Sequence, residues 1–363
     1  MKIAVDAREL TGRPTGVGRY LAELLAEWGG SRETRSHDWR LYSHDEPQVP
    51  EPFRAAVRVL PGSGGTRWEQ WTLPHALDAD PPDVLFAPGY TAPIRARCPV
   101  VLTVHDVSFA AHPEWFRFRE GARRRMVTQW SARRAAIVLT DSAFSRGEIV
   151  RHLAVGGERI RVIPLGIRLP GTIAPVTREP LVLFVGSLFT RRHVDALISA
   201  FASRVAPGVA RSRLEIVGED RSHPPVNPGR LLTLQPLEVQ RRITIRSYVD
   251  DETLKALYAQ ASVFAFPSEY EGFGLTPLEA LAAGVPPVVL DTPIATEIYG
   301  PAAYYVPATP PLTDRLGEAL IHVLTSETAR NDVLQHAPAV LARYRWDRTA
   351  AATFDALVEA ARG

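Results

Sequence analysis

Residues 267–284 read PSEYEGFGLTPLEALAAG, and the rest of the chain is organised around this stretch. The residues VFAF at 263–266 form a short apolar run, which predicts a buried strand that ends where the stretch begins. The following loop contains Gly272 and Gly274, whose missing side chains let the backbone approach a ligand closely. A helix with Thr276 as its N-cap is expected next. The pattern therefore places free backbone amides where a strand ends and a helix begins, which favours anion binding.

Two glutamates lie in this loop and in the helix that follows it. Glu271 lies in the loop and Glu279 in the first helical turn, with seven residues between them. A carboxylate between a buried strand and a pair of glycines favours a ligand contact for Glu271, and a solvated loop carboxylate is the alternative. Glu279 follows Thr276 by three residues, so a capping box that binds the N-cap amide is the alternative for Glu279.

The segment EGFGLTPLE, followed by ALAAG, resembles the E-x7-E motif of the retaining GT-B glycosyltransferases of glycosyltransferase family 4. The resemblance implies that Glu271 contacts the donor sugar and that Glu279 contacts the ribose of the nucleotide. The backbone amides of the loop and helix start are the further donor-binding candidates, namely those of Gly272, Phe273, Gly274, Leu275 and Thr276.

The composition argues against several other classes of protein. A net charge of +2 gives no argument for nucleic-acid binding. Lys2 and Lys255 are the only lysines, which disfavours a pyridoxal-phosphate enzyme, and we expect no cofactor. Cys98 is the only cysteine, so no internal disulfide can form. The amino-terminal apolar run ends at Asp6 and predicts no signal peptide, so we expect a cytoplasmic protein.

The segment 115–134 combines aromatic residues with many arginines. An amphipathic basic helix of this kind can bind an anionic bilayer, which leaves open a peripheral contact at the inner face of the membrane. A solvated surface with core aromatic residues beneath it is the alternative.

The apolar pattern predicts the fold class. Residues 2–5 read as a strand, 12–18 as a glycine loop and 19–28 as an amphipathic helix, an opening typical of a Rossmann-like half. A second strand at 181–185, followed by a loop at Gly186 and a helix, repeats this opening. Short apolar runs alternate with helical segments elsewhere, which predicts mostly parallel sheets. We therefore expect an α/β chain of two Rossmann-like domains that face each other across a cleft, as in GT-B enzymes.

The irregular stretch at 165–177 marks the expected domain boundary. We expect an N-terminal, acceptor-side domain at 1–168 and a C-terminal, nucleotide-sugar-binding domain at 176–340. The resemblance implies that the last helix, within 341–363, returns to the first domain.

The glycine loop is a weak signal by itself. Gly16-x-Gly18 is followed by Leu21 where the dinucleotide fingerprint has a third glycine, so a plain tight turn is the alternative. The resemblance implies that Gly16 and Gly18 face the cleft near the donor phosphates and the acceptor.

His105 follows the predicted strand at 100–104. The stretch HDVSFAAHPEWF at 105–116 resembles the family's HD segment, which implies that His105 lies against the donor sugar. A structural histidine is the alternative, and Asp106 is interpreted as its orienting neighbour or as a turn residue.

The stretch GSLFTRRHVDALISAF begins at Gly186 and places Arg191 and Arg192 where a helix is expected to start. Positive charge in a first helical turn opposes the helix dipole, at a cost of about a few tenths of a kcal/mol unless an anion binds. The family has Arg-Lys here and clamps the diphosphate with it, which implies a diphosphate site with Arg192 in place of lysine. Ser187 is a second departure, because many relatives carry arginine there. A solvated arginine pair is the alternative.

These residues predict a reaction. Loss of a nucleoside diphosphate leaves negative charge that the arginines and the amides can stabilise. Asp78-Ala79-Asp80 superficially resembles a metal-binding D-x-D motif but is interpreted as a solvated loop, so no metal site is predicted. The resemblance implies retaining transfer of mannose or glucose from a GDP- or UDP-hexose, GDP-mannose first, to a glycan or lipid-linked acceptor in polysaccharide biosynthesis. The alternatives are a non-catalytic nucleotide-sugar-binding protein and another GT-B enzyme, such as a sugar-nucleotide epimerase.

Overall fold

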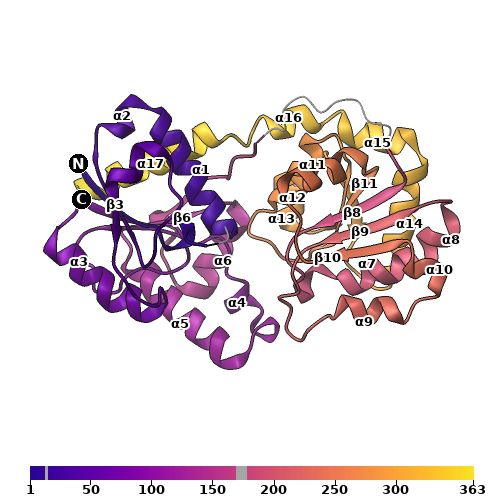
Figure 1. The fold of residues 1–363 in the computed structure, drawn as a ribbon, viewed down its shortest axis with the longest axis horizontal. Helices are drawn as coiled ribbons and strands as arrows, with labels where there is room; N and C mark the ends of the chain where they lie inside the picture. Colours follow the sequence, from indigo (N-terminus) through magenta and orange to yellow (C-terminus); the bar gives the residue numbers. More distant parts are fainter. Residues whose placement is uncertain (13–14, 169–177) are drawn as a thin grey trace. The chain divides into compact units, whose positions relative to one another are not determined.

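The computed structural model of the chain describes residues 1–12, 15–168 and 178–363 and divides into two compact units (Figure 1). Unit 1 comprises Met1–Pro113, Phe118–Gly166 and Tyr344–Gly363, and unit 2 comprises Glu114–Arg117 and Ile167–Arg343. Most of the expected boundary stretch, residues 169–177, lies outside the described residues.

Unit 1 contains a seven-stranded sheet in the order β3-β2-β1-β4-β5-β6-β7, and every pairing is parallel. The strands β4, β5 and β6 are buried along their whole length, as expected for apolar runs covered by helices on both faces. The strands are β1 (Lys2–Asp6), β2 (Asp38–Ser43), β3 (Val57–Val59), β4 (Val84–Ala87), β5 (Val100–Thr103), β6 (Ile137–Thr140) and β7 (Ile160–Val162).

Helices flank this sheet, with α1 and α17 above the strands and α3 and α5 below them in Figure 1. The indole Nε1 of Trp28 on α1 donates to the carbonyl of Ala350 on α17 at 3.0 Å, which ties the last helix to unit 1. The helices are α1 (Gly16–Gly30), α2 (Arg32–Arg35), α3 (Leu73–Ala79), α4 (Ser108–Ala111), α5 (Phe118–Arg134), α6 (Ala143–Leu153) and α17 (Trp346–Arg362).

The first helix begins earlier than the sequence predicts. Gly16 and Gly18 were expected in a loop, but both lie in α1, because the side chain of Thr15 caps the helix and accepts from the amide of Gly18 at 3.1 Å. A Cβ at position 18 would lie 2.4 Å from the carbonyl oxygen of Glu9. Glycine is therefore needed at this position to let the helix approach the preceding backbone. Residues 13 and 14 of the predicted loop lie outside the described residues.

Unit 2 contains a six-stranded parallel sheet in the order β10-β9-β8-β11-β12-β13. The strands predicted at 181–185 and 263–266 are confirmed with those bounds, and both are apolar runs that are buried along nearly their whole length. The strands are β8 (Leu181–Val185), β9 (Arg213–Val217), β10 (Ile243–Arg246), β11 (Val263–Phe266), β12 (Pro287–Asp291) and β13 (Tyr304–Pro307).

Helices also flank the sheet of unit 2, with α11 and α12 above the strands and α7 and α9 below them in Figure 1. They are α7 (Val194–Ala200), α8 (Ala206–Gly208), α9 (Pro228–Thr233), α10 (Leu237–Gln240), α11 (Asp251–Gln260), α12 (Leu275–Ala282), α13 (Pro293–Tyr299), α14 (Leu312–Thr325), α15 (Glu327–Leu334) and α16 (Ala337–Leu341). The expectation of two α/β domains with parallel sheets is confirmed.

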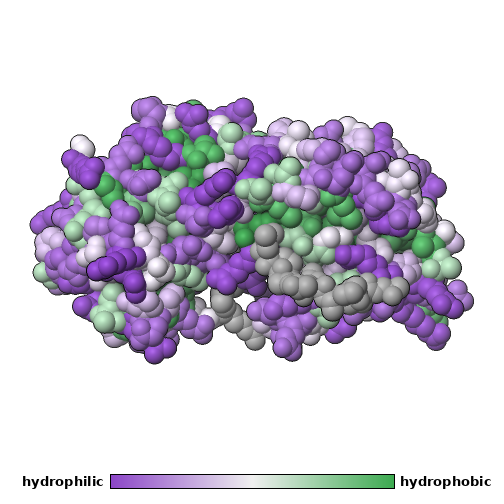
Figure 2. All heavy atoms as spheres, turned by 90° about the horizontal axis from the view of Figure 1, so that it is seen from above, coloured by the Kyte–Doolittle hydropathy of each residue, from purple (hydrophilic) through white to green (hydrophobic). Residues whose placement is uncertain are grey.

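The surface drawn in Figure 2 is mainly hydrophilic, with apolar residues gathered in smaller areas. Within the described ranges, no helix combines the length and the apolar character that crossing a membrane requires.

Candidate active site

The strand order of unit 2 places two loops side by side. β8 and β11 are neighbours in the sheet although 77 residues separate their ends, Val185 and Val263, and the order reverses between them. Ligands of open parallel sheets bind outside the carboxyl ends of the strands at such a reversal. The loop after β8 carries Gly186 and the arginine pair, and the loop after β11 carries Glu271. The sheet topology thus brings together predicted site residues that are far apart in the sequence.

Glu271 and Arg192 form an ion pair at this edge. Nε of Arg192 lies 2.6 Å from Oε1 of Glu271, and each side chain is only 13% exposed. The hydroxyl of Ser268 donates to the same carboxylate oxygen at 2.9 Å. Burial by itself raises the pKa of the Glu271 carboxyl, but the charges of Arg192 and Arg191 and the two hydrogen bonds outweigh burial and hold this pKa below its usual value. Glu271 is therefore a carboxylate at neutral pH.

Arg191 is buried beside this pair. Its Nε donates to the carbonyl of Tyr270 at 3.0 Å, and its guanidinium lies over the ring of Phe189 at 4.3 Å. The ring of Trp115 is 6.0 Å from the same guanidinium and 6.1 Å from the ring of Tyr270. Sequence reasoning grouped Trp115 with the basic helix at 115–134. The structure instead assigns Trp115 to unit 2, where it covers Arg191.

The arginine pair does not oppose a helix dipole as predicted. Arg191 and Arg192 lie in a 3-10 turn, η6 (Thr190–Arg192), and α7 begins only at Val194 because His193 adopts a left-handed conformation with φ 44°. Nearby carbonyls and Glu271 compensate the two charges.

Several donors of the arginine pair remain available. Arg192 uses Nε for Glu271 and Nη1 for the carbonyl of Ser187, and Arg191 uses Nε alone. Nη2 of Arg192 and both terminal nitrogens of Arg191 have no hydrogen-bond partner in the described part of the chain. A guanidinium presents five N–H donors, and its fork matches phosphate oxygens. The pair can therefore bind a diphosphate without losing the contacts that position it.

Two predicted glycines are required by close contacts inside unit 2. Gly186 has φ +144°, and a Cβ there would lie 2.7 Å from Nη1 of Arg192. Gly274 has φ +93°, and a Cβ there would lie 2.1 Å from the hydroxyl of Tyr299. That hydroxyl donates to the carbonyl of Gly274 at 3.0 Å. Both glycines thus shape the loops that carry Arg192 and Glu271.

The helix after the loop starts differently from the prediction. α12 begins at Leu275, and its N-cap is Gly274 in a left-handed conformation, so Thr276 lies inside the first turn. The predicted N-cap at Thr276 and the alternative of a capping box with Glu279 are both wrong, because the left-handed glycine already turns the chain into the helix. Glu279 accepts instead from the hydroxyl of Tyr258 at 3.3 Å.

The other residues of the loop contribute its buried lining. Gly272 and Phe273 are buried, and Leu275 is half-buried. Phe273 lines a small cavity together with Ser268 and Glu271. The loop therefore packs inward and holds the carboxylate in place.

His105 lies in unit 1, directly after β5. Its Nδ1 is 2.8 Å from Oδ2 of Asp141, and its Nε2 is 3.1 Å from the carbonyl oxygen of Pro88. The carbonyl of Pro88 and an ionised Asp141 both accept, so satisfying the two together requires a doubly protonated ring. Burial by itself lowers the pKa of His105, but the charge of Asp141 and the hydrogen bonds to Asp141 and Pro88 outweigh burial and raise this pKa. A sugar contact of His105 would use the ring's C–H edge or replace one of these bonds.

Asp106 is a turn residue and not the partner of His105. Its Oδ1 accepts from the amide of Ser108 at 2.8 Å, and its Oδ2 accepts from the hydroxyl of Tyr90 at 2.8 Å. The orienting carboxylate is Asp141, which sequence reasoning missed. Asp141 follows β6, the neighbour of β5, so the signal that could have found it is its place at an adjacent strand end.

The acidic residues at 78–80 have structural partners. Asp80 ends α3 and pairs with Lys2 and Arg40, so this stretch is a paired helix terminus and not the solvated loop that we expected. Over the described residues, no group of three or more His, Cys, Asp or Glu side chains is arranged to hold a metal ion.

Two family models match the chain. The model described as "Glycosyl transferases group 1" matches residues 171–339, and the model described as "Glycosyltransferase Family 4" matches residues 14–169. The chain is also 27% identical to O-antigen chain mannosyltransferase B of Escherichia coli over an alignment of 396 residues, which covers 98% of this chain and 99% of that protein.

Two further proteins are similar to the chain. The MMP alpha-(1->4)-mannosyltransferase of Mycolicibacterium hassiacum is 31% identical over 227 residues, which covers 56% of this chain and 51% of that protein. The crystal structure of Anabaena HepE in complex with UDP-glucose matches with a TM-score of 0.74 at 18% identity, and covers 98% of this chain and 100% of that chain. The chain therefore belongs to glycosyltransferase family 4 and has the GT-B fold.

Proposed function

We propose that the chain moves a hexose, mannose or glucose, from a GDP- or UDP-hexose to a glycan or lipid-linked acceptor, with retention of configuration and without a metal or cofactor. The observation that carries the proposal is the cluster of Arg191, Arg192 and Glu271 at the carboxyl ends of β8 and β11. The similarity to two mannosyltransferases supports a hexosyl donor, and the similarity to HepE in complex with UDP-glucose supports a nucleotide sugar.

The arginines would stabilise the leaving group. When the anomeric bond breaks, negative charge develops on the diphosphate, and preorganised donors lower the barrier most. The unoccupied terminal nitrogens of Arg191 and Nη2 of Arg192 would donate to that diphosphate. The ion pair with Glu271 holds Arg192 in place before the donor arrives, so little reorganisation is needed during the reaction.

Glu271 would position the sugar. Its Oε1 is occupied by Arg192 and Ser268, whereas Oε2 has no hydrogen-bond partner among the described residues. Because its pKa is lowered, the carboxylate is ionised and accepts hydrogen bonds, which suits sugar hydroxyls and developing positive charge at the anomeric carbon. We propose that Glu279 accepts from the ribose hydroxyls and that the amides of residues 272–276 assist the arginines.

A donor panel tests this function. The protein is incubated with GDP-mannose, GDP-glucose, UDP-glucose and UDP-galactose, with and without lipid-linked acceptors, and release of nucleoside diphosphate is measured. One GDP- or UDP-hexose should give release that increases with acceptor, and NMR of the product should show the anomeric configuration of the donor. A donor at about 100-fold its Kd should stabilise the fold by about 2.7 kcal/mol. Stabilisation without release for every acceptor would support the non-catalytic alternative instead.

We also propose a peripheral membrane contact through α5. Phe118, Met126 and Trp130 on this helix are 88%, 56% and 56% exposed, and several arginines lie between them. Apolar and cationic side chains on one helix bind anionic bilayers. The protein should sediment with phosphatidylglycerol vesicles and not with phosphatidylcholine vesicles. Replacing Phe118 and Trp130 by serine should abolish sedimentation.

The matched control for this contact lies in unit 2. Leu234 is 71% exposed, so Leu234→Ser removes a similar exposed apolar side chain outside α5. Equal loss of sedimentation in both variants would contradict a specific contact through α5.

A further inference from the structure

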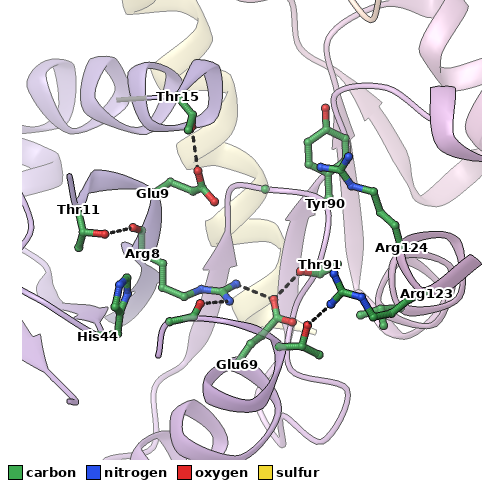
Figure 3. A pocket seen from close by; sticks show the side chains of 14 residues that line it. Arg8, Glu9, Thr11, Thr15, His44, Glu69, Tyr90, Thr91, Arg123 and Arg124 are labelled. Atoms are coloured by element: carbon green, nitrogen blue, oxygen red, sulfur yellow. Dashed lines mark hydrogen bonds and ion pairs between the residues drawn. The ribbon is translucent and has the colours of Figure 1, made fainter. Parts of the chain in front are cut away.

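Unit 1 contains a polar cavity of about 320 Å³ that the function above does not use (Figure 3). It lies at the reversal of strand order between β1 and β4, where the segments after the two strands meet. Arg8, Glu9 and Thr15 come from the first segment, and Tyr90 and Thr91 come from the second. The volume is within the range of about 300–1,000 Å³ that is usual for small-molecule sites. The position and size therefore indicate a ligand site within unit 1.

One wall of the cavity carries carboxylates held in fixed positions. Glu69 is only 2% exposed, and its Oε1 accepts from Nη2 of Arg8 at 2.6 Å and from the hydroxyl of Thr91 at 2.5 Å. Glu9 accepts from the hydroxyl of Thr15 at 2.8 Å. In Figure 3, dashed lines join Glu69 to Arg8 and Thr91, and a separate dashed line joins Glu9 to Thr15. Carboxylates and hydroxyls in fixed positions are suited to binding the hydroxyls of a sugar.

Cations occupy the opposite wall. Arg123 and Arg124 extend from α5 toward Thr91 and Tyr90 in Figure 3. Arg123 donates to the hydroxyl of Thr66 at 2.6 Å, and neither arginine forms an ion pair with a carboxylate of the described residues. By contrast, Arg8 is compensated by Asp6 and Glu69 at 2.7 and 2.6 Å. The cavity therefore has two guanidiniums whose charge the chain itself does not compensate.

Aromatic rings hold Arg124 toward the cavity. Its guanidinium is 5.3 Å from the ring of Tyr90 and 5.8 Å from the ring of Phe109. Tyr90 has φ 61°, and its hydroxyl donates to Asp106 at 2.8 Å. A left-handed conformation is strained for a bulky residue, and such strain is enriched at functional sites. A cation–π contact positions Arg124 but does not neutralise it, so its N–H groups remain available for an anion.

We propose that this cavity binds an acceptor saccharide that carries one anionic group, a uronate carboxylate or a phosphate. The anionic group binds Arg123 and Arg124, and the sugar hydroxyls bind Glu9 and Glu69. Guanidiniums bind both anions in bidentate fashion, so the two sources share one recognition chemistry. The identification of the ligand as the acceptor rests on the proposed function, whereas the binding of an anionic saccharide rests on the cavity.

Direct binding tests the cavity without turnover. Calorimetry compares methyl glucuronide and mannose 6-phosphate with methyl mannoside and inorganic phosphate. At least one anionic sugar should bind about tenfold or more tightly than the neutral sugar, and which one binds identifies the carboxylate or the phosphate. Inorganic phosphate that binds as tightly as the sugar phosphate would overturn the saccharide part of the proposal, because it would show a plain anion site.

Variants of α5 locate the binding. Arg124→Gln should weaken binding of the anionic sugar about tenfold, a change of about 1.4 kcal/mol. Arg134→Gln removes a charge from the same helix outside the cavity and should leave that binding unchanged. Equal affinities of the two variants, or equal binding of neutral and anionic sugars, would overturn the proposal.

Donor hydrolysis separates the two proposals. Release of nucleoside diphosphate from the donor without acceptor does not require a ligand in the cavity of unit 1. If the unmodified protein hydrolyses no nucleotide sugar but binds the anionic sugar, the proposed function fails and the cavity stands. If it hydrolyses a donor but binds no anionic sugar, the cavity proposal fails and the function stands.

Discussion

Nε of Arg192 lies 2.6 Å from Oε1 of Glu271, and this contact joins the ends of two adjacent strands of unit 2. Both groups are largely removed from water, so their attraction is screened much less than that of a surface pair. Breaking such a buried pair by removing one partner costs about 3–5 kcal/mol, because the other charge is left without compensation. The pair therefore contributes to the fold and to the site, and the two contributions can be measured separately.

The first prediction concerns stability and pH. Because the pKa of Glu271 is lowered, the pair stabilises the fold above the unfolded pKa of about 4.3, and this stabilisation is lost as the pH falls through the lower folded pKa. In Arg192→Gln this pKa should rise, because burial is then opposed only by the charge of Arg191 and the hydrogen bond from Ser268. The variant should be about 3–5 kcal/mol less stable at pH 7, and the difference should narrow as the pH falls and Glu271 takes up a proton.

Denaturant unfolding between pH 7 and pH 5 measures this narrowing. Arg204→Gln is the matched control, because Arg204 and Asp314 form an exposed pair at 2.7 Å in the same unit. It should cost no more than about 1 kcal/mol at any of these pH values. A difference between Arg192→Gln and the unmodified protein that stays constant with pH would contradict the assignment of Glu271 as the titrating group.

The second prediction concerns catalysis. Glu271→Gln keeps the size of the side chain and can still accept from Arg192, but it removes the negative charge. We expect kcat for hexosyl transfer to fall about 10²-fold, which is the effect of removing one preorganised electrostatic group. Steady-state rates with saturating donor measure this change. Glu269→Gln, which alters a more exposed carboxylate two residues earlier, should leave kcat within a factor of about two, and a comparable loss there would argue against a specific role for Glu271.

The third prediction concerns His105 in unit 1. Its pKa is raised, so protonation of this ring stabilises the fold fully below the unfolded pKa of about 6.5, and this stabilisation is lost as the pH rises through the higher folded pKa. In Asp141→Asn, burial should lower the pKa of His105 below 6.5. The unmodified protein should then gain stability from this group as the pH falls from 8 to 6.5, whereas the variant should lose stability below pH 6.5.

Melting curves from pH 8 to below pH 6.5 measure how the stability of each protein changes with pH. NMR titration of the His105 ring shows whether its pKa lies above or below 6.5. His105→Gln has no titratable ring at this position and should show neither of these pH dependences of stability. This variant therefore distinguishes the contribution of His105 from that of the other histidines. Identical pH profiles for Asp141→Asn and the unmodified protein would contradict an imidazolium held by Asp141.

The sequence predicts the strands of both sheets well because they are apolar runs bounded by glycine, proline or polar residues. The run at 263–266 is a strand with those bounds for this reason. The contact of Arg192 with Glu271 could not be predicted from spacing, since it depends on β8 and β11 becoming neighbours. The residue types alone favoured a ligand contact for Glu271 and an anion at the arginine pair, and the resemblance to a family implied that both residues belong to one donor site.

Helix starts were the weaker part of the prediction. Thr276 looks like an N-cap by residue type, but the N-cap is Gly274. Gly274 has a left-handed backbone conformation, and the need for that conformation arises only when the loop is folded. Asp141 and Glu69 were missed because each becomes a partner only when the strand ends meet. Tertiary contacts therefore decided both the caps and the carboxylate partners.

The fourth prediction concerns the contact between Gly274 and Tyr299. Gly274 has φ +93°, and an added Cβ would lie 2.1 Å from the hydroxyl of Tyr299. A non-glycine residue in a left-handed conformation costs about 1–2 kcal/mol, and overpacking costs about 1–3 kcal/mol more. Gly274→Ala should therefore destabilise the protein by about 2–5 kcal/mol in denaturant unfolding and should lower donor affinity, because the loop that holds Glu271 must shift.

Removing the hydroxyl separates the two causes. Tyr299→Phe deletes the atom that the added methyl group meets. The double variant Gly274→Ala/Tyr299→Phe should therefore regain the stability lost to overpacking, but it should still lack the stability lost to the left-handed backbone. The single change Tyr299→Phe should cost about 0.5–1.5 kcal/mol, since one hydrogen bond to the carbonyl of Gly274 is lost. Gly229→Ala is the control, because Gly229 has open space around its Cβ position and no positive φ. If the double variant were as unstable as the sum of the two single variants, the close contact would not be the cause, and the left-handed backbone alone would explain why glycine is needed here.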